Sequence, residues 1–226
     1  EWAEQFLIAT ATGVDPKAAA DPEARLALTA VYTGLLTRTP EEQEAELAAE
    51  PDGRRMERLL RDPERSVRRL SAVAQLNQHE RLVLLGDPGS GKSTFVNFVA
   101  MCLAGEALGR EDANLAALTG PLPDDEGDDQ KERQPWKRGA PLPVRVVLRD
   151  FAATGLPAPG ETVGAAHLCE FVAEELRRAD LGEYVDHFRR DLRERGSLLL
   201  LDGLDEVPQA ERHREQIKQV VADFCM

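Results

Sequence analysis

Two short stretches of the sequence contain the residues whose types and spacing are best suited to chemistry. The first, GDPGSGKS at residues 86–93, fits the pattern G-x-x-x-x-G-K-[ST] of a phosphate-binding loop. Its glycines allow positive φ and a close approach of backbone N–H groups to a ligand, and with the start of a helix they form a nest for anionic oxygens. The predicted binding residues here are Gly86, Asp87, Pro88, Gly89, Ser90, Gly91, Lys92, Ser93 and Thr94, although Pro88 has no N–H to donate.

Two side chains at the end of this loop have separate predicted roles. Lys92 would place a compact positive charge on the β and γ phosphates of a nucleoside triphosphate, and it is therefore a candidate catalytic residue. The Ser93 hydroxyl is a hard oxygen donor of the kind that binds Mg²⁺. The loop therefore predicts a phosphate site with a metal beside it.

The second stretch is SLLLLDGLDEV at residues 197–207, where four leucines lead directly into Asp202. This pattern is typical of a buried strand that delivers a carboxylate to the carboxyl edge of a sheet, where ligands bind in open α/β proteins. Asp202 is therefore the second predicted Mg²⁺ ligand, through water, and Asp205 and Glu206 are candidates to orient and deprotonate an attacking water. Alternatively, the last two acids simply cap a helix that begins at Pro208.

The elements that must position these residues follow from the hydrophobic pattern. Four apolar residues at 82–85 precede the loop without alternation, which predicts a strand buried on both faces of a parallel sheet. Apolar residues from Phe95 onward recur at helical spacing. A second strand is predicted at 144–148, and helices are predicted at 162–179 and at 181–195, the latter ending at Gly196. The fold class is therefore α/β, with a parallel sheet flanked by helices.

Two further regions lie outside this pattern. Residues 1–79 are predicted to be mostly helical, with a short strand or a helix end at 31–36. Residues 110–141 are rich in proline and contain the acidic cluster at 124–129, so we expect a mobile insertion that buries little apolar surface. The predicted domains are therefore 1–79 and 80–226.

Composition narrows the classes of function. The net charge of −13 argues against a nucleic-acid-binding surface spread over the chain. Three widely spaced cysteines show no metal-ligand spacing and favour reduced thiols in a cytoplasmic protein. No apolar run approaches the roughly 18 residues of a membrane span, and the first residues lack the basic region of a signal peptide.

Together, the segments LVLLGDPGSGKSTF, LPVRVVLRDF and LLLLDGLDEV resemble the NACHT domain of the STAND class of P-loop NTPases, over roughly residues 80–226. The resemblance implies that the catalytic base is Asp205 or Glu206, and that Tyr32 and Thr33 lie near an adenine ring. The family places a sensor strand between the phosphate-loop strand and the acidic strand, and a helical lid and a winged-helix region later in the chain. Because this strand would follow Met226, we expect the sequence to be a fragment of a longer polypeptide.

The resemblance also implies a function: a switch that binds ATP or ADP with Mg²⁺, hydrolyses ATP slowly, and controls self-oligomerisation and a fused or recruited effector in innate immune or antiviral defence. A nucleotide-binding scaffold without significant turnover is the alternative. A GTPase is disfavoured, because no segment matches the guanine-reading motif N-K-x-D.

Overall fold

The computed structural model describes residues 34–37, 70–122, 132–158, 161–207 and 210–224. These residues divide into two compact units, of which the first comprises 92–118 and 140–224 and the second comprises 34–91 and 119–139. Tyr32, Thr33 and most of the predicted N-terminal helical region lie outside the described residues.

The first unit is built on a small parallel sheet. Strand β3 (Leu142–Val147) pairs with β4 (Ser197–Asp202), in a register that sets Leu142 opposite Ser197 and Val147 opposite Asp202. A parallel pair needs a long connection. Here it consists of α8 (Leu148–Thr154), α9 (Ala165–Arg178), the short helix η3 (Gly182–Tyr184) and α10 (Val185–Glu194). The protein is thus of mixed α/β class.

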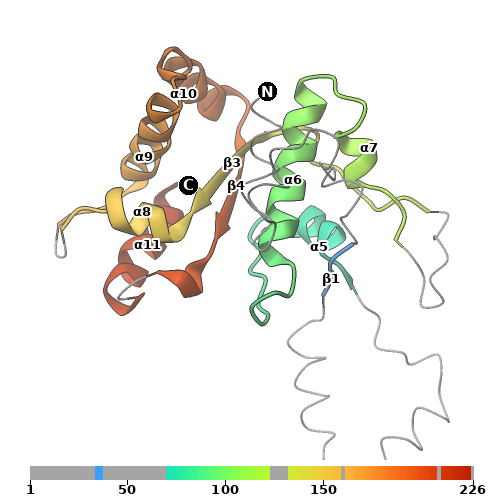
Figure 1. The fold of residues 1–226 in the computed structure, drawn as a ribbon, viewed down its shortest axis with the longest axis horizontal. Helices are drawn as coiled ribbons and strands as arrows, with labels where there is room; N and C mark the ends of the chain where they lie inside the picture. Colours follow the sequence, from blue (N-terminus) through green and yellow to red (C-terminus); the bar gives the residue numbers. More distant parts are fainter. Residues whose placement is uncertain (1–33, 38–69, 123–131, 159–160, 208–209, 225–226) are drawn as a thin grey trace, which may run out of the picture. The chain divides into compact units, whose positions relative to one another are not determined.

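The two strands lie between α6 (Lys92–Ala107) on one side and α8, α9 and α11 (Ala210–Phe224) on the other (Figure 1). Side chains alternate between the two faces of a strand. Val144 and Val146 enter a core with residues of the second group of helices, among them Phe151, whose ring packs edge to face on Phe171 with centroids 5.3 Å apart. Arg145 and Asp202 consequently lie on the opposite face, which α6 covers.

Most of the expected elements of this unit are observed. The predicted helices at 162–179 and 181–195 correspond to α9 and to η3 with α10, and Gly196 has the positive φ of 72° expected after a helix end. The predicted strand at 144–148 is observed as β3, two residues longer at its start and ending at Val147. Helix α8, which follows directly at Leu148, was not predicted.

Residues 110–122, the described first part of the segment predicted as a mobile insertion at 110–141, differ from that prediction. Asn114 accepts a hydrogen bond from the Ala117 N–H at the start of the short helix α7 (Leu115–Leu118), and Ala113 and Leu118 are buried. The chain packs tightly here, since a Cβ on Gly105 of α6 would lie 1.8 Å from the Ala113 carbonyl oxygen. The prediction was therefore wrong for these residues, because a few well-placed apolar contacts outweigh a polar composition.

The second unit contains a short antiparallel pair, β1 (Leu36–Thr37) with β2 (Leu70–Ser71), followed by α5 (Ala72–Gln78). Ser71 caps α5 by accepting a hydrogen bond from the Ala74 N–H at 3.2 Å. Arg138 donates to the carbonyl oxygens of Leu76 and His79, and so attaches the segment before β3 to the end of this helix.

The strand predicted at residues 82–85 is not formed, so that prediction was wrong. These residues belong to no sheet; the side chain of Val83 is 76% exposed and that of Leu85 is 90% exposed. A strand requires a neighbour to take its backbone hydrogen bonds, and the described residues pair only β1 with β2 and β3 with β4.

In the part of the chain that the structure describes, no helix combines the length and apolar character that crossing a membrane requires.

Candidate functional site

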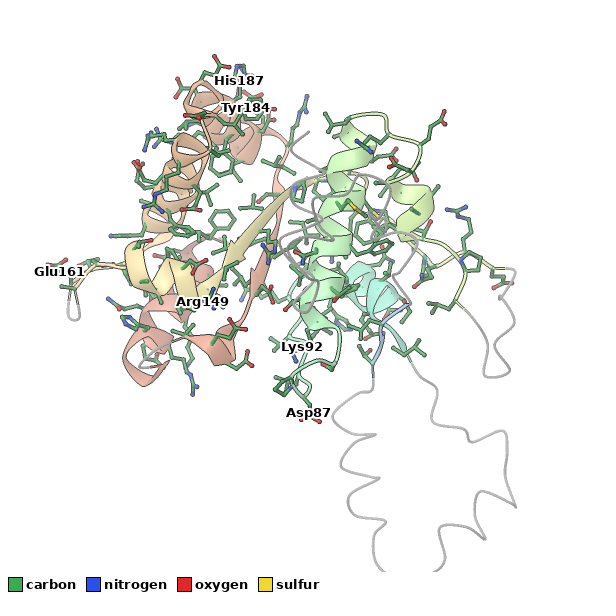
Figure 2. The ribbon with its side chains drawn as sticks, viewed as in Figure 1. Asp87, Lys92, Arg149, Glu161, Tyr184 and His187 are labelled. Atoms are coloured by element: carbon green, nitrogen blue, oxygen red, sulfur yellow. The ribbon has the colours of Figure 1, made fainter. Side chains whose placement is uncertain are left out.

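The first turn of α6 and the last residue of β4 meet in the first unit. The Ser93 hydroxyl donates a hydrogen bond of 2.8 Å to Oδ1 of Asp202, although the two residues are 109 positions apart in the sequence. Lys92 is the first residue of the same helix (Figure 2). The two predicted metal ligands therefore lie side by side.

The Asp202 carboxylate has a second partner on the neighbouring strand. Its Oδ2 atom accepts a hydrogen bond of 3.1 Å from Nη2 of Arg145, and the two side chains are only 12% and 16% exposed. The register explains this pair, because Arg145 lies opposite Leu200, two positions before Asp202 on the same face of the sheet. Burial of a carboxylate is costly unless it is paired and hydrogen-bonded, and here each oxygen has a donor.

The oxygens of Ser93 and Asp202 are a suitable donor set for Mg²⁺. This ion prefers hard oxygen ligands and usually keeps several waters, with one or two protein ligands and the phosphates of a bound substrate. The hydroxyl and the carboxylate therefore fit a metal site that is completed by water and phosphate oxygens. In the described residues, no group of three or more His, Cys, Asp or Glu side chains could hold a metal ion.

The chain turns sharply after Asp202. Gly203 has φ of 76°, a conformation that glycine adopts without steric cost, and the short helix η4 (Leu204–Glu206) follows. Asp205 and Glu206 are both exposed in η4, ahead of α11.

Glu206 is held by an arginine of α8. Nη1 of Arg149 lies 3.2 Å from Oε2 of Glu206, and Nε of Arg149 lies 3.3 Å from Oδ1 of Asp150. The side chains of Arg149 and Glu206 are 54% and 56% exposed, so water screens their attraction. Figure 2 shows Arg149 on α8. This contact positions one of the two candidate bases.

The glycine-rich loop belongs to the second unit and runs directly into α6. Gly89 and Gly91 have φ of 81° and 88°, as the motif predicts, and the Ser90 N–H donates to the Asp87 carbonyl oxygen at 3.1 Å. The loop is exposed from Gly86 to Ser90, and a Cβ on Gly89 would meet no atom within 4 Å. Its backbone therefore has the open, positive-φ form that phosphate binding needs. Thr94 is exposed in the first turn of α6.

Neither Arg145 nor Arg149 was among the site residues predicted from the sequence. The signal for Arg145 was present, since it is the one charged residue in the strand sequence LPVRVV. The observed register, with Val147 opposite Asp202, places it two residues from Asp202 on the same face, whereas the predicted strand end at residue 148 would have placed it three residues away on the opposite face. Arg149 carried no comparable signal, because an arginine that follows a strand is usually a solvated residue.

No model of a known protein family matches the chain, and comparison with curated proteins and with solved structures gave no match.

Proposed function

We propose that this chain binds ATP and ADP with Mg²⁺ and hydrolyses ATP slowly, as the nucleotide-dependent switch of a signalling protein. The observation that carries the proposal is the hydrogen bond between Ser93 and Asp202. Ser93 and Asp202 belong to two motifs that are far apart in the sequence. A nucleoside triphosphate with its metal is the ligand that requires the two residues together.

Each residue has a defined task in this proposal. The amides of the glycine-rich loop and the ammonium group of Lys92 would bind the phosphates, with the positive end of the α6 dipole supporting the negative charge. Ser93 and Asp202 would hold Mg²⁺, the latter through water. When bound, the metal would neutralise charge that develops on the phosphate oxygens during transfer.

The attacking water requires a base, and Glu206 is the better placed of the two candidates. It lies one short turn after Asp202, and its N–H donates to the Gly203 carbonyl oxygen at 3.2 Å. Nη1 of Arg149 lies 3.2 Å from its carboxylate. Because that ion pair is exposed and weak, Glu206 can leave it to accept a proton from water. Asp205 is the alternative base.

The resemblance to NACHT domains supports the wider function. ADP would hold a closed monomer, and ATP with Mg²⁺ would favour a form that oligomerises and activates a fused or recruited effector. A γ-phosphate biases such an equilibrium only through contacts that ADP lacks. The expected setting is cytoplasmic, in innate immune or antiviral defence. Tyr32 and Thr33 are the candidates for contact with adenine.

Phosphate release measured on the parent chain and on Glu206→Gln and Asp205→Asn variants tests the catalytic part. We expect the variant that removes the base to lose at least about a hundredfold in turnover, with ATP binding retained. Glu194→Gln is the matched control, because it removes an exposed glutamate at the end of α10. Equal nucleotide binding without phosphate release in any form would favour the scaffold, and GTP outcompeting ATP would contradict the choice of nucleotide.

A further inference from the structure

Both oxygens of the Asp202 carboxylate accept hydrogen bonds from side chains of the protein. Oδ1 accepts the Ser93 hydroxyl at 2.8 Å, and Oδ2 accepts the Arg145 guanidinium at 3.1 Å. The first partner is itself a candidate metal ligand and would remain beside the ion. The second is a cation, and a cation does not share a carboxylate with a divalent metal without electrostatic cost.

The position of Arg145 makes that cost considerable. It is flanked on β3 by Val144 and Val146, which are 4% and 1% exposed, and its own side chain is 16% exposed. Charges at such positions are screened less than those at the surface. Burying an arginine in an apolar strand is also unfavourable unless it neutralises an opposite charge. The charge that Arg145 neutralises is that of the predicted metal ligand.

We propose that Arg145 is an internal counter-ion that competes with Mg²⁺ for Asp202 and so sets the metal concentration at which the site fills. Without metal, Arg145 balances the Asp202 carboxylate and stabilises the metal-free state. A divalent cation held beside Asp202 places a second positive charge near the carboxylate, which weakens the hydrogen bond between the guanidinium and Oδ2. This inference rests on the proposed function, and it adds a regulatory residue that neither motif contains.

The test measures metal affinity and not turnover. The parent and an Arg145→Gln variant are saturated with ADP, and Mn²⁺, a spectroscopic substitute for Mg²⁺, is titrated and followed by electron paramagnetic resonance. We expect the variant to bind Mn²⁺ at least about tenfold more tightly, because a whole positive charge beside the ion is worth more than the 1.4 kcal/mol of a tenfold change. Arg178→Gln is the control of equal net charge. It removes an arginine that pairs with Glu175 on the exposed side of α9, and we expect parent-like affinity.

A second measurement follows Arg145 in the parent, in case Arg145→Gln does not fold. The ¹⁵N-labelled guanidinium groups are observed by NMR, and the Arg145 signal is identified by its absence from an Arg145→Lys variant. We expect Mg²⁺ with ADP to shift that signal and to speed its proton exchange, whereas ADP with EDTA leaves it unchanged.

The outcomes separate the two proposals. The counter-ion role is overturned, and nucleotide binding is left intact, if ADP binds and the parent and Arg145→Gln have equal affinity for Mn²⁺. It is also overturned if the NMR signal of Arg145 does not change when Mg²⁺ is added. Failure of the parent to bind ADP with or without metal overturns the proposed function, and the counter-ion role with it.

Discussion

Removing the Arg145 side chain should destabilise the metal-free protein far more than removing a surface arginine. At a charge separation of roughly 4 Å and an effective dielectric constant of about 20, the attraction to Asp202 is about 4 kcal/mol. The pair is 12% and 16% exposed and each member has lost hydration, so part of this attraction repays desolvation. Arg145→Met leaves Asp202 without its cation, and we expect a loss of about 2–4 kcal/mol in the free energy of unfolding.

A double-mutant cycle isolates the pair. Replacing both members, as Arg145→Met with Asp202→Leu, removes the charge and its uncompensated partner together, so the double variant should lie within about 1 kcal/mol of the parent. Urea unfolding in EDTA, followed by circular dichroism, measures all four proteins. Arg178→Met, which removes one member of a half-exposed pair on α9, should change stability by no more than about 0.5 kcal/mol. Two results would contradict a buried ion pair between Arg145 and Asp202. One is a loss of stability in Arg145→Met as small as that of the control. The other is a loss in the double variant that equals the sum of the two single losses.

Substitutions at Gly105, Phe151 and Cys102 test the packing of the first unit, with Gly182→Ala as a control. Gly105→Ala should lower stability in thermal unfolding by about 1–3 kcal/mol, because the new Cβ would lie 1.8 Å from a backbone oxygen. Gly182→Ala should be nearly neutral, because its Cβ meets only a side-chain carbon at 3.7 Å. Equal melting temperatures for the two variants would contradict this prediction. Phe151→Ala should cost about 3–5 kcal/mol in urea unfolding, and a loss below about 1 kcal/mol would mean that its ring is not at the centre of the core. Burial raises the pKa of Cys102 from 9.0 to about 12, against a smaller lowering by a hydrogen bond with the Asn114 backbone. The thiol's contribution to stability is therefore complete below pH 9 and is lost as pH rises toward 12. The urea midpoint should consequently fall more steeply in the parent than in Cys102→Ala between about pH 8 and pH 10. Parallel pH profiles of the two proteins would contradict the raised pKa of Cys102.

The features that the sequence predicts correctly are those encoded by strong local patterns. The leucine run that ends at Asp202 forms β4, and the apolar spacing after Lys92 forms α6. The approach of Ser93 to Asp202 follows from placing a loop-to-helix junction and a strand end at one edge of an α/β unit. The first two predictions hold because each depends on a pattern within one segment, whereas Ser93 reaches Asp202 from the start of α6 without the parallel strand that was predicted before it.

The features that it misses depend on partners elsewhere in the chain. An apolar run at 82–85 has the composition of a buried strand, but composition does not supply the neighbouring backbone that a strand requires. The pairing of Arg145 with Asp202 depends on the register of two strands more than fifty residues apart. Likewise, the burial of Ala113 depends on the close approach that Gly105 allows, which no hydrophobic pattern within the segment reveals.

Equilibrium binding of a fluorescent ADP analogue, measured with Mg²⁺ and again with EDTA, tests whether Lys92, Ser93 and Asp202 form a site for a nucleotide and its metal. We expect the parent to bind the analogue more tightly with Mg²⁺, Asp202→Asn to lose this metal dependence, and Lys92→Ala to bind at least about tenfold more weakly. Binding by Lys92→Ala as tight as that of the parent, or no effect of Mg²⁺ on the parent, would contradict a nucleotide and metal site at these residues.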